Sequence, residues 1–234
     1  RAAAMPGRLD AALAAARAAG FATEAGRAAP GEAPGESGAA DLLLLAADGG
    51  RTFAAFRAAP EAADGAPDPL DRWSRRVAEA LAADLGARAV LPFDGPPWAP
   101  FLRWALAIEP VWPSRLGPTL HAERGLWASW RAALAFPEGA LAPPPRPDPG
   151  PRPCDACAAP CLSACPVGAF AETDEGPRYD VDACAAHVGS PAGVECRTRG
   201  CLARRACPVG AAFAQAPEQA AFHMAAFLRA RPEG

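Results

Sequence analysis

Eight cysteines crowd into one short part of this chain, between Cys154 and Cys207, and no cysteine occurs elsewhere in its 234 residues. The first four stand in "CDACAAPCLSACP", with Pro166 directly after the fourth. The later four are more widely spaced, and Pro208 again follows the last. The pentapeptide ACPVG occurs in both places, at 164–168 and 206–210. Ordinary buried cysteines do not cluster in this way, so the sequence predicts a specific role for these thiols. The eight are Cys154, Cys157, Cys161, Cys165, Cys184, Cys196, Cys201 and Cys207.

The surroundings of these thiols are expected to be reducing. No apolar stretch approaches the roughly 18–20 residues of a membrane-spanning helix. Arg8, Asp10 and Arg17 interrupt the first apolar segment, so it does not resemble the core of a signal peptide. We therefore expect a cytoplasmic protein without membrane contact, in which cysteines stay reduced. A disulfide framework is the alternative that an oxidising compartment would require.

The spacing of the first four cysteines favours an iron–sulfur cluster. Bacterial ferredoxins use a C-x2-C-x2-C-x3-C-P run, and in two-cluster proteins its fourth cysteine binds the other cluster. This chain has that run with one extra residue in the second gap. Proline after the last cysteine fixes φ and directs the chain away from the first cluster. Two Cys-Pro steps and eight thiolates thus predict two 4Fe-4S clusters, with two four-cysteine zinc sites as the alternative.

Between the tryptophans and the cysteines lies a proline-rich segment. Seven of the eleven residues 143–153 are proline, which excludes a helix or a central strand there. The simplest interpretation is an α/β module over residues 1–140, a linker over 141–153 and a ferredoxin-like module with a C-terminal helix over 154–234. The fold class is then α+β. A proline-rich loop over a single core is the alternative.

Periodicity places several elements in the first module. Helices are expected over 8–19 and 68–86, the second with Pro69 in its first turn and Gly86 at its end. A buried strand is expected over 41–47 and another strand over 87–93. The stretch 118–136 fits either a hairpin around "ERG" or a strand that enters a helix. A terminal amphipathic helix is expected over 217–230.

The cysteine region resembles the iron–sulfur module of epoxyqueuosine reductases, with a lone Cys184 before a "GC…CP" ending. That family uses cobalamin and two 4Fe-4S clusters to deoxygenate a modified tRNA base. Arg204 stands where the family has the middle cysteine of its second run, and Cys196 replaces it from upstream. The family's crossed arrangement assigns the first cluster to Cys154, Cys157, Cys161 and Cys207, and the second to Cys165, Cys184, Cys196 and Cys201.

The first module resembles CblC-type cobalamin-processing proteins in "DPLDRW" and "GPTLHAERGLWASWRAALAFP". The resemblance implies a nitroreductase-related, cobalamin-reductase-like fold, with His121, Gly125 and Trp127 at cofactor-binding positions. "FDGPP" (93–97) is similar to the segment of epoxyqueuosine reductases that carries the catalytic acid, so Asp94 is the expected proton donor. A turn or capping aspartate and a core histidine are the alternatives for Asp94 and His121.

Together these features predict an iron–sulfur redox protein that passes electrons to a cofactor, a corrinoid or less favourably a flavin, for a reductive reaction. The alternatives are a ferredoxin-type carrier without catalysis and a corrinoid-trafficking protein. Expected partners are an external electron donor or acceptor protein and a small-molecule or tRNA substrate. The arginines of "RTRGCLARRAC" fit a docking surface, a cluster-tuning role or a solvated face. The chain has no lysine, which excludes a lysine Schiff base, and its net charge of −3 gives no general field for nucleic acid.

Overall fold

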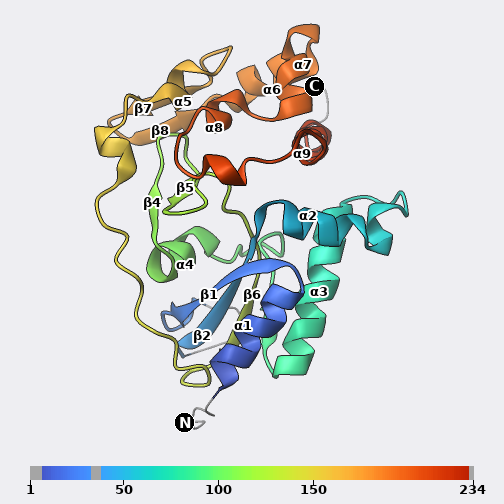
Figure 1. The fold of residues 1–234 in the computed structure, drawn as a ribbon, viewed down its shortest axis with the longest axis vertical. Coiled ribbons are helices and arrows are strands. Elements are labelled where there is room, and N and C mark those ends of the chain that lie inside the picture. Colours follow the sequence, from blue (N-terminus) through green and yellow to red (C-terminus); the bar gives the residue numbers. More distant parts are fainter. Residues whose placement is uncertain (1–6, 33–37, 232–234) are drawn as a thin grey trace. The chain divides into compact units, whose positions relative to one another are not determined.

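The computed structural model describes residues 7–32 and 38–231, and its chain is divided into two compact units (Figure 1). Unit 1 comprises Arg1–Pro110 and Ser129–Asp148; unit 2 comprises Val111–Ala128 and Pro149–Gly234. The chain therefore crosses between units three times, whereas one crossing, through a linker over 141–153, was expected. The predicted first module 1–140 loses residues 111–128 to the cysteine unit. Residues 143–152 form no helix or strand, as their prolines predict.

Unit 1 is built on a four-stranded antiparallel sheet with the order β1-β2-β6-β3. Its two middle strands are almost wholly buried, which explains their continuous leucine and alanine runs. Strands with both faces covered need apolar residues at every position rather than at alternate ones. The strands are β1 (Phe21–Ala28), β2 (Ala40–Ala47), β3 (Arg88–Val90) and β6 (Trp130–Pro137).

Helices pack on both faces of this sheet. Phe21 of β1 contacts Trp73 of α3, with ring centroids 5.5 Å apart. On the opposite face Gly26 of β1 meets Ile108 of α4 so closely that a Cβ would lie 2.4 Å from the isoleucine. The small residue thus lets α4 approach the sheet. The helical elements of the unit are α1 (Arg8–Ala18), α2 (Gly49–Arg57), η1 (Pro60–Ala62), α3 (Pro69–Leu85) and α4 (Phe101–Ile108).

The sequence expectations for unit 1 are largely confirmed. The predicted helices 8–19 and 68–86 are α1 and α3, and the predicted strands 41–47 and 87–93 correspond to β2, which begins one residue earlier, and to the shorter β3. The option of a helix ending near residue 136 is wrong, because β6 occupies 130–137. Alanine-rich sequence has little intrinsic preference for strand, but β2 and β3 pair with the two edges of β6 and the core covers its faces. The observed class is mixed α+β with small antiparallel sheets.

Unit 2 consists of short elements joined by tight turns. Two antiparallel hairpins, β4–β5 and β7–β8, accompany a set of short helices, and the longer α9 contacts α6 and α7. Its apolar core is small and centres on Leu116, Leu120 and Leu126, against which several cysteines pack. The elements are β4 (Val111–Pro113), β5 (Thr119–His121), η2 (Pro153–Ala156), α5 (Pro160–Ser163), β7 (Phe170–Thr173), β8 (Gly176–Tyr179), α6 (Val181–Gly189), η3 (Pro191–Gly193), α7 (Val194–Arg199), α8 (Leu202–Arg205), η4 (Ala211–Phe213) and α9 (Pro217–Arg229).

Over residues 7–32 and 38–231, no helix combines the length and the apolar character that crossing a bilayer would need. The predicted terminal helix 217–230 is confirmed as α9.

Candidate metal centres

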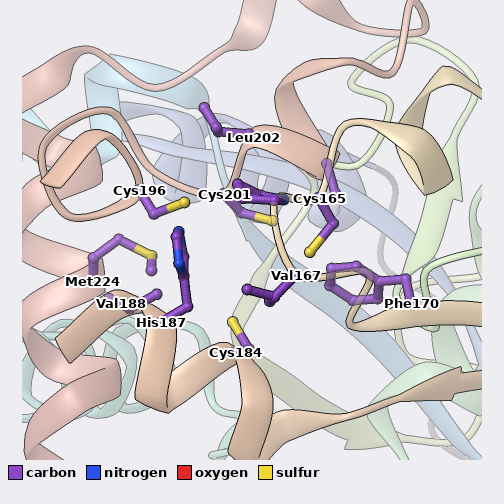
Figure 2. Close-up of a pocket in the computed structure, with 12 residues that line it drawn as sticks. Cys165, Val167, Phe170, Cys184, His187, Val188, Cys196, Cys201, Leu202 and Met224 are labelled. Atoms are coloured by element: carbon purple, nitrogen blue, oxygen red, sulfur yellow. The ribbon is translucent and has the colours of Figure 1, made fainter. Parts of the chain in front are cut away.

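The eight cysteines surround two separate cavities in unit 2, four at each. The first cavity has a volume of about 290 Å³. The second is much smaller, about 20 Å³, and apolar side chains crowd it. Figure 2 shows the four sulfurs of the second group around its centre, with His187 directed into it. We name the groups site I (Cys154, Cys157, Cys161, Cys207) and site II (Cys165, Cys184, Cys196, Cys201). This grouping matches the crossed arrangement, in which the cysteine before each proline binds at the other site.

Electrostatic coupling among the thiols follows the same division. At site I, burial raises the pKa of Cys161, and the neighbouring Cys207 and Cys154 raise it further. At site II, burial raises the pKa of Cys201, and Cys184 and Cys165 add to the effect. Each thiolate therefore disfavours ionisation of its neighbours, and a bound cation would offset this repulsion.

The repeated Cys-Pro-Val-Gly steps have the same local form. Gly168 and Gly210 both adopt the left-handed conformation, with φ of 59° and 70°. After the first step Ala169 N donates to Cys165 Sγ over 3.3 Å, and after the second the backbone at Val209 lowers the pKa of Cys207 against the larger effect of burial. Each Cys-Pro step therefore leaves one site and delivers its sulfur to the other.

The backbone around the buried sulfurs partly offsets the effect of burial on their pKa values. Burial raises the pKa of Cys201, which stands directly before α8, and the backbone at Arg204 and Ala203 lowers it. The backbone at Leu202 lowers the pKa of Cys196 in the same way, and that at Leu162 lowers the pKa of Cys161. These influences favour the thiolate, which is the form that binds metal.

Site I is framed by the segment 111–128, which sequence reasoning placed in the other module. Arg115 lines its cavity and donates to the Cys154 carbonyl oxygen over 2.7 Å and to Glu172 over 2.8 Å. The turn at Gly125 lies directly against the second Cys-Pro-Val-Gly step. A Cβ on Gly125 would stand 1.9 Å from the Val209 oxygen, and one on Gly210 would stand 2.4 Å from the Arg124 carbonyl carbon. Two glycines are required because two backbones touch.

Site II is framed by helices. Cys184 lies on α6 and Cys196 on α7, so the long gap between them is a helix–turn–helix. Gly193 allows the turn, because a Cβ there would lie 2.1 Å from the His187 oxygen. Arg197 donates to the carbonyl oxygens of Val188 and Ser190 at the end of α6. The unusual spacing of the second set is thus accommodated by α6 and α7.

The residues expected to hold a corrinoid, His121, Gly125 and Trp127, all lie in unit 2 rather than in the first module. His121 is buried, and its Nδ1 accepts hydrogen bonds from the backbone N–H groups of Glu123 (3.0 Å) and Arg124 (3.1 Å). Burial, followed by the charge of Arg124, lowers its pKa to about 4. Together with Gly125, it holds a turn of unit 2 against the cysteine loops, where the expectation was a cofactor site in the first module.

Trp127 also has a packing role. The Arg204 guanidinium lies over its ring at 4.3 Å, and Arg204 Nε donates to the Leu126 oxygen over 2.8 Å. The arginine that stands in place of the family's cysteine therefore joins segment 111–128 to α8. Trp127, like His121 and Gly125, belongs to unit 2.

Asp94, the expected proton donor, is exposed in unit 1 and forms a bidentate ion pair with Arg75. The pair raises the pKa of Arg75. Both carboxylate oxygens of Asp94 accept from this guanidinium. The structure gives this role no support.

The arginines around the second cysteine set are engaged within unit 2. Arg199 pairs with Glu195 at 3.1 Å, and Arg205 donates to the carbonyl oxygens of Arg199 and Gln215. With Arg197 bound to α6 and Arg204 over Trp127, local hydrogen bonding accounts for these side chains. A docking surface for an acidic partner or RNA is not needed to explain them.

A single metal ion at either site is a poorer match. A tetrahedral zinc site needs sulfurs about 2.3 Å from one ion, hence close to one another. Within residues 7–32 and 38–231, no three His, Cys, Asp or Glu side chains converge in this way. The sulfurs of each group instead stand apart around their cavity.

No protein-family model and no curated protein matches this sequence. The likeness to epoxyqueuosine reductases and CblC-type proteins therefore stays with the short motifs quoted above.

Proposed function

We propose that this protein is an electron-transfer protein that holds one 4Fe-4S cluster at site I and another at site II. The observation that carries the proposal is the division of eight cysteines into two groups of four around separate cavities. Soft thiolates and N–H groups directed at sulfur are the donor set that such clusters use. When bound, the clusters would supply one-electron transfer.

The residues around the sites fit this role. The Cys-Pro steps after α5 and α8 each serve the other site, and α5 contacts α8 directly. The two sets of ligands are thereby fixed on packed elements, which favours a short and constant separation between the two centres. Burial of Cys161 and Cys196 limits contact of the ligands with water. Unit 2 on this proposal is a ferredoxin-like module.

The relation of unit 1 to the cobalamin-reductase fold is also a proposal, and it rests on the quoted motifs alone. The residues named for the corrinoid are packing residues of unit 2 or an exposed ion pair, so no step is routed through a corrinoid. Carrier activity is therefore the primary proposal. Corrinoid-dependent catalysis is the second candidate function, and the addition of cobalamin described below tests it.

The test is anaerobic purification followed by dithionite reduction, monitored by visible absorption and electron paramagnetic resonance. We expect broad absorption near 400 nm that bleaches, and two reducible paramagnetic centres per chain. Absence of reducible centres would overturn the proposal. Cobalamin is then added to the reduced protein. An unchanged corrinoid spectrum and unchanged tryptophan fluorescence leave the carrier role, whereas a shift in both restores the corrinoid enzyme.

A further inference from the structure

We infer that Arg115 raises the reduction potential of the cluster at site I through its positive charge, an inference that rests on the proposed function. Arg115 lies in the turn between β4 and β5, within the segment 111–128 that frames site I. Its side chain lines the cavity of site I together with the four cysteines. Arg115 is the only charged residue among the described residues that line this cavity.

The guanidinium of Arg115 is held in place from two directions. Its Nη2 donates to the Cys154 carbonyl oxygen over 2.7 Å, and its Nη1 donates to the Glu172 carboxylate over 2.8 Å. The Arg115 side chain is only 21% exposed. Because Cys154 is itself a ligand of site I, the first bond fixes the positive charge beside the ligand loop rather than in solvent.

Glu172 lies on the outer side of this ion pair. It belongs to β7, its side chain is 41% exposed, and it is not among the described residues that line the cavity. The pair therefore presents its positive member to site I and its negative member to water. Since water screens an exposed charge more strongly than a largely buried one, Glu172 offsets only part of the field of Arg115.

A fixed cation at this place acts on the redox equilibrium of a cluster. A cubane with four thiolate ligands is net anionic, and each added electron increases its negative charge. A nearby positive charge therefore stabilises the reduced form more than the oxidised form, which raises the potential. Among the described residues that line site II, none carries a permanent charge. The effect of Arg115 is expected at one cluster rather than at both.

The test is a potentiometric titration of the anaerobic holoprotein, followed by electron paramagnetic resonance. Arg115→Gln removes the charge, and we expect the midpoint potential of site I to fall by about 59 mV, a tenfold shift in a one-electron equilibrium. Arg115→Lys keeps the charge and should retain most of the wild-type potential. The potential that Cys165→Ala retains and Cys207→Ala loses identifies site I.

Glu172→Gln is the second variant, and it leaves the bond from Arg115 to the Cys154 oxygen in place. It should raise the same potential that Arg115→Gln lowers, by a smaller amount, because the carboxylate is partly screened. A loosened ligand loop would not produce shifts of opposite sign from the two partners.

Arg152→Gln is the matched control. Arg152 stands two residues before Cys154, pairs with Asp155 at 3.0 Å, and is not among the described residues that line the cavity. The substitution removes the same charge from the same loop. It should move neither potential.

The inference is overturned if Arg115→Gln leaves the site I potential unchanged or moves both potentials equally, or if Glu172→Gln lowers the site I potential. An equal fall in Arg152→Gln would also overturn it. These results leave two reducible centres, so the proposed function would stand. If Arg115→Gln loses iron, the sign of the shift in Glu172→Gln decides. A wild type without reducible centres would instead refute the proposed function, and this inference with it.

Discussion

Site I and site II use the same number of cysteines but are held by different kinds of structure. Site I depends on backbone-to-backbone packing between the turn at Gly125 and the second Cys-Pro-Val-Gly step, with Arg115 bound to the Cys154 carbonyl. Site II depends on helices, with Cys184 and Cys196 on α6 and α7. A duplicated motif therefore does not produce two equivalent sites. The chain around each motif decides how rigid, how open and how polar the site becomes.

The largest expected effects come from removing one ligand of each group. Cys207→Ala and Cys165→Ala should each lower bound iron from about eight to about four per chain, because each disrupts one four-thiolate site. The cluster left in Cys207→Ala should match that left in Cys161→Ala by paramagnetic spectrum and potential. The cluster left in Cys165→Ala should match that left in Cys196→Ala. If the cluster left in Cys207→Ala matched that left in Cys196→Ala instead, Cys207 would belong to site II. The assignment of cysteines to the two sites would then be wrong.

Gly168 and Gly210 end the two copies of ACPVG, so the same substitution can be compared at both positions. Gly168→Ala should cost about 1 kcal/mol of stability, since its positive φ is strained for alanine but no atom lies within 4 Å of the new Cβ. Gly210→Ala should cost about 3 kcal/mol, because its Cβ would also collide with backbone at Arg124 and Gly125. Thermal unfolding of both variants measures the difference. Equal costs would mean that segment 111–128 does not frame site I.

Acid should weaken the frame of site I through His121. Its pKa in the folded protein, about 4, lies below its ordinary value of 6.5, so the unfolded chain binds the proton more readily. Stability is full above pH 6.5 and falls as the pH drops from 6.5 toward 4. The loss between pH 7 and pH 5 is about 2 kcal/mol.

The matched variant is His121→Asn, which keeps an acceptor for the two backbone N–H groups but does not titrate in this range. Unfolding of both proteins is compared at pH 7 and pH 5, so that acid effects on the clusters cancel. The wild type should lose about 2 kcal/mol more than the variant. Identical losses of stability would show that protonation of His121 does not destabilise the folded protein.

The smallest effect is expected at Glu172, whose side chain is 41% exposed. Glu172→Gln should cost less than about 1 kcal/mol, as is usual for a solvated ion pair. Arg115 would keep its bond to the Cys154 oxygen, which is the contact that holds the loop. A cost well above this value, measured by thermal unfolding, would make the ion pair rather than that bond the anchor of site I.

The short gaps from Cys154 to Cys165 and the two Cys-Pro steps are local signals, and they predicted two groups of four cysteines, with glycine at 168 and 210 at the turns. The assignment of each cysteine to a group came from the crossed arrangement of the epoxyqueuosine reductases that this region resembles. Apolar periodicity likewise located α1 and α3. These signals depend on neighbours within a few residues.

The role of segment 111–128 could not be read in the same way. Its attachment to unit 2 is made by backbone atoms at Gly125, Val209 and Gly210 and by the bond from Arg115 to a carbonyl oxygen. Backbone contacts leave no pattern of side-chain type. The cofactor role of His121, Gly125 and Trp127 was instead inferred from the resemblance to CblC-type proteins. A glycine in both of the touching turns is the one signal that pointed to a close approach.

The central claim is that two groups of four thiolates each hold a cubane, and metal analysis tests it most directly. Iron, acid-labile sulfide and zinc should be quantified together in protein kept free of oxygen from lysis onward. We predict about eight iron and about eight sulfide per chain, with zinc absent. Stoichiometric zinc without sulfide, or a chain that binds no metal, would contradict the account.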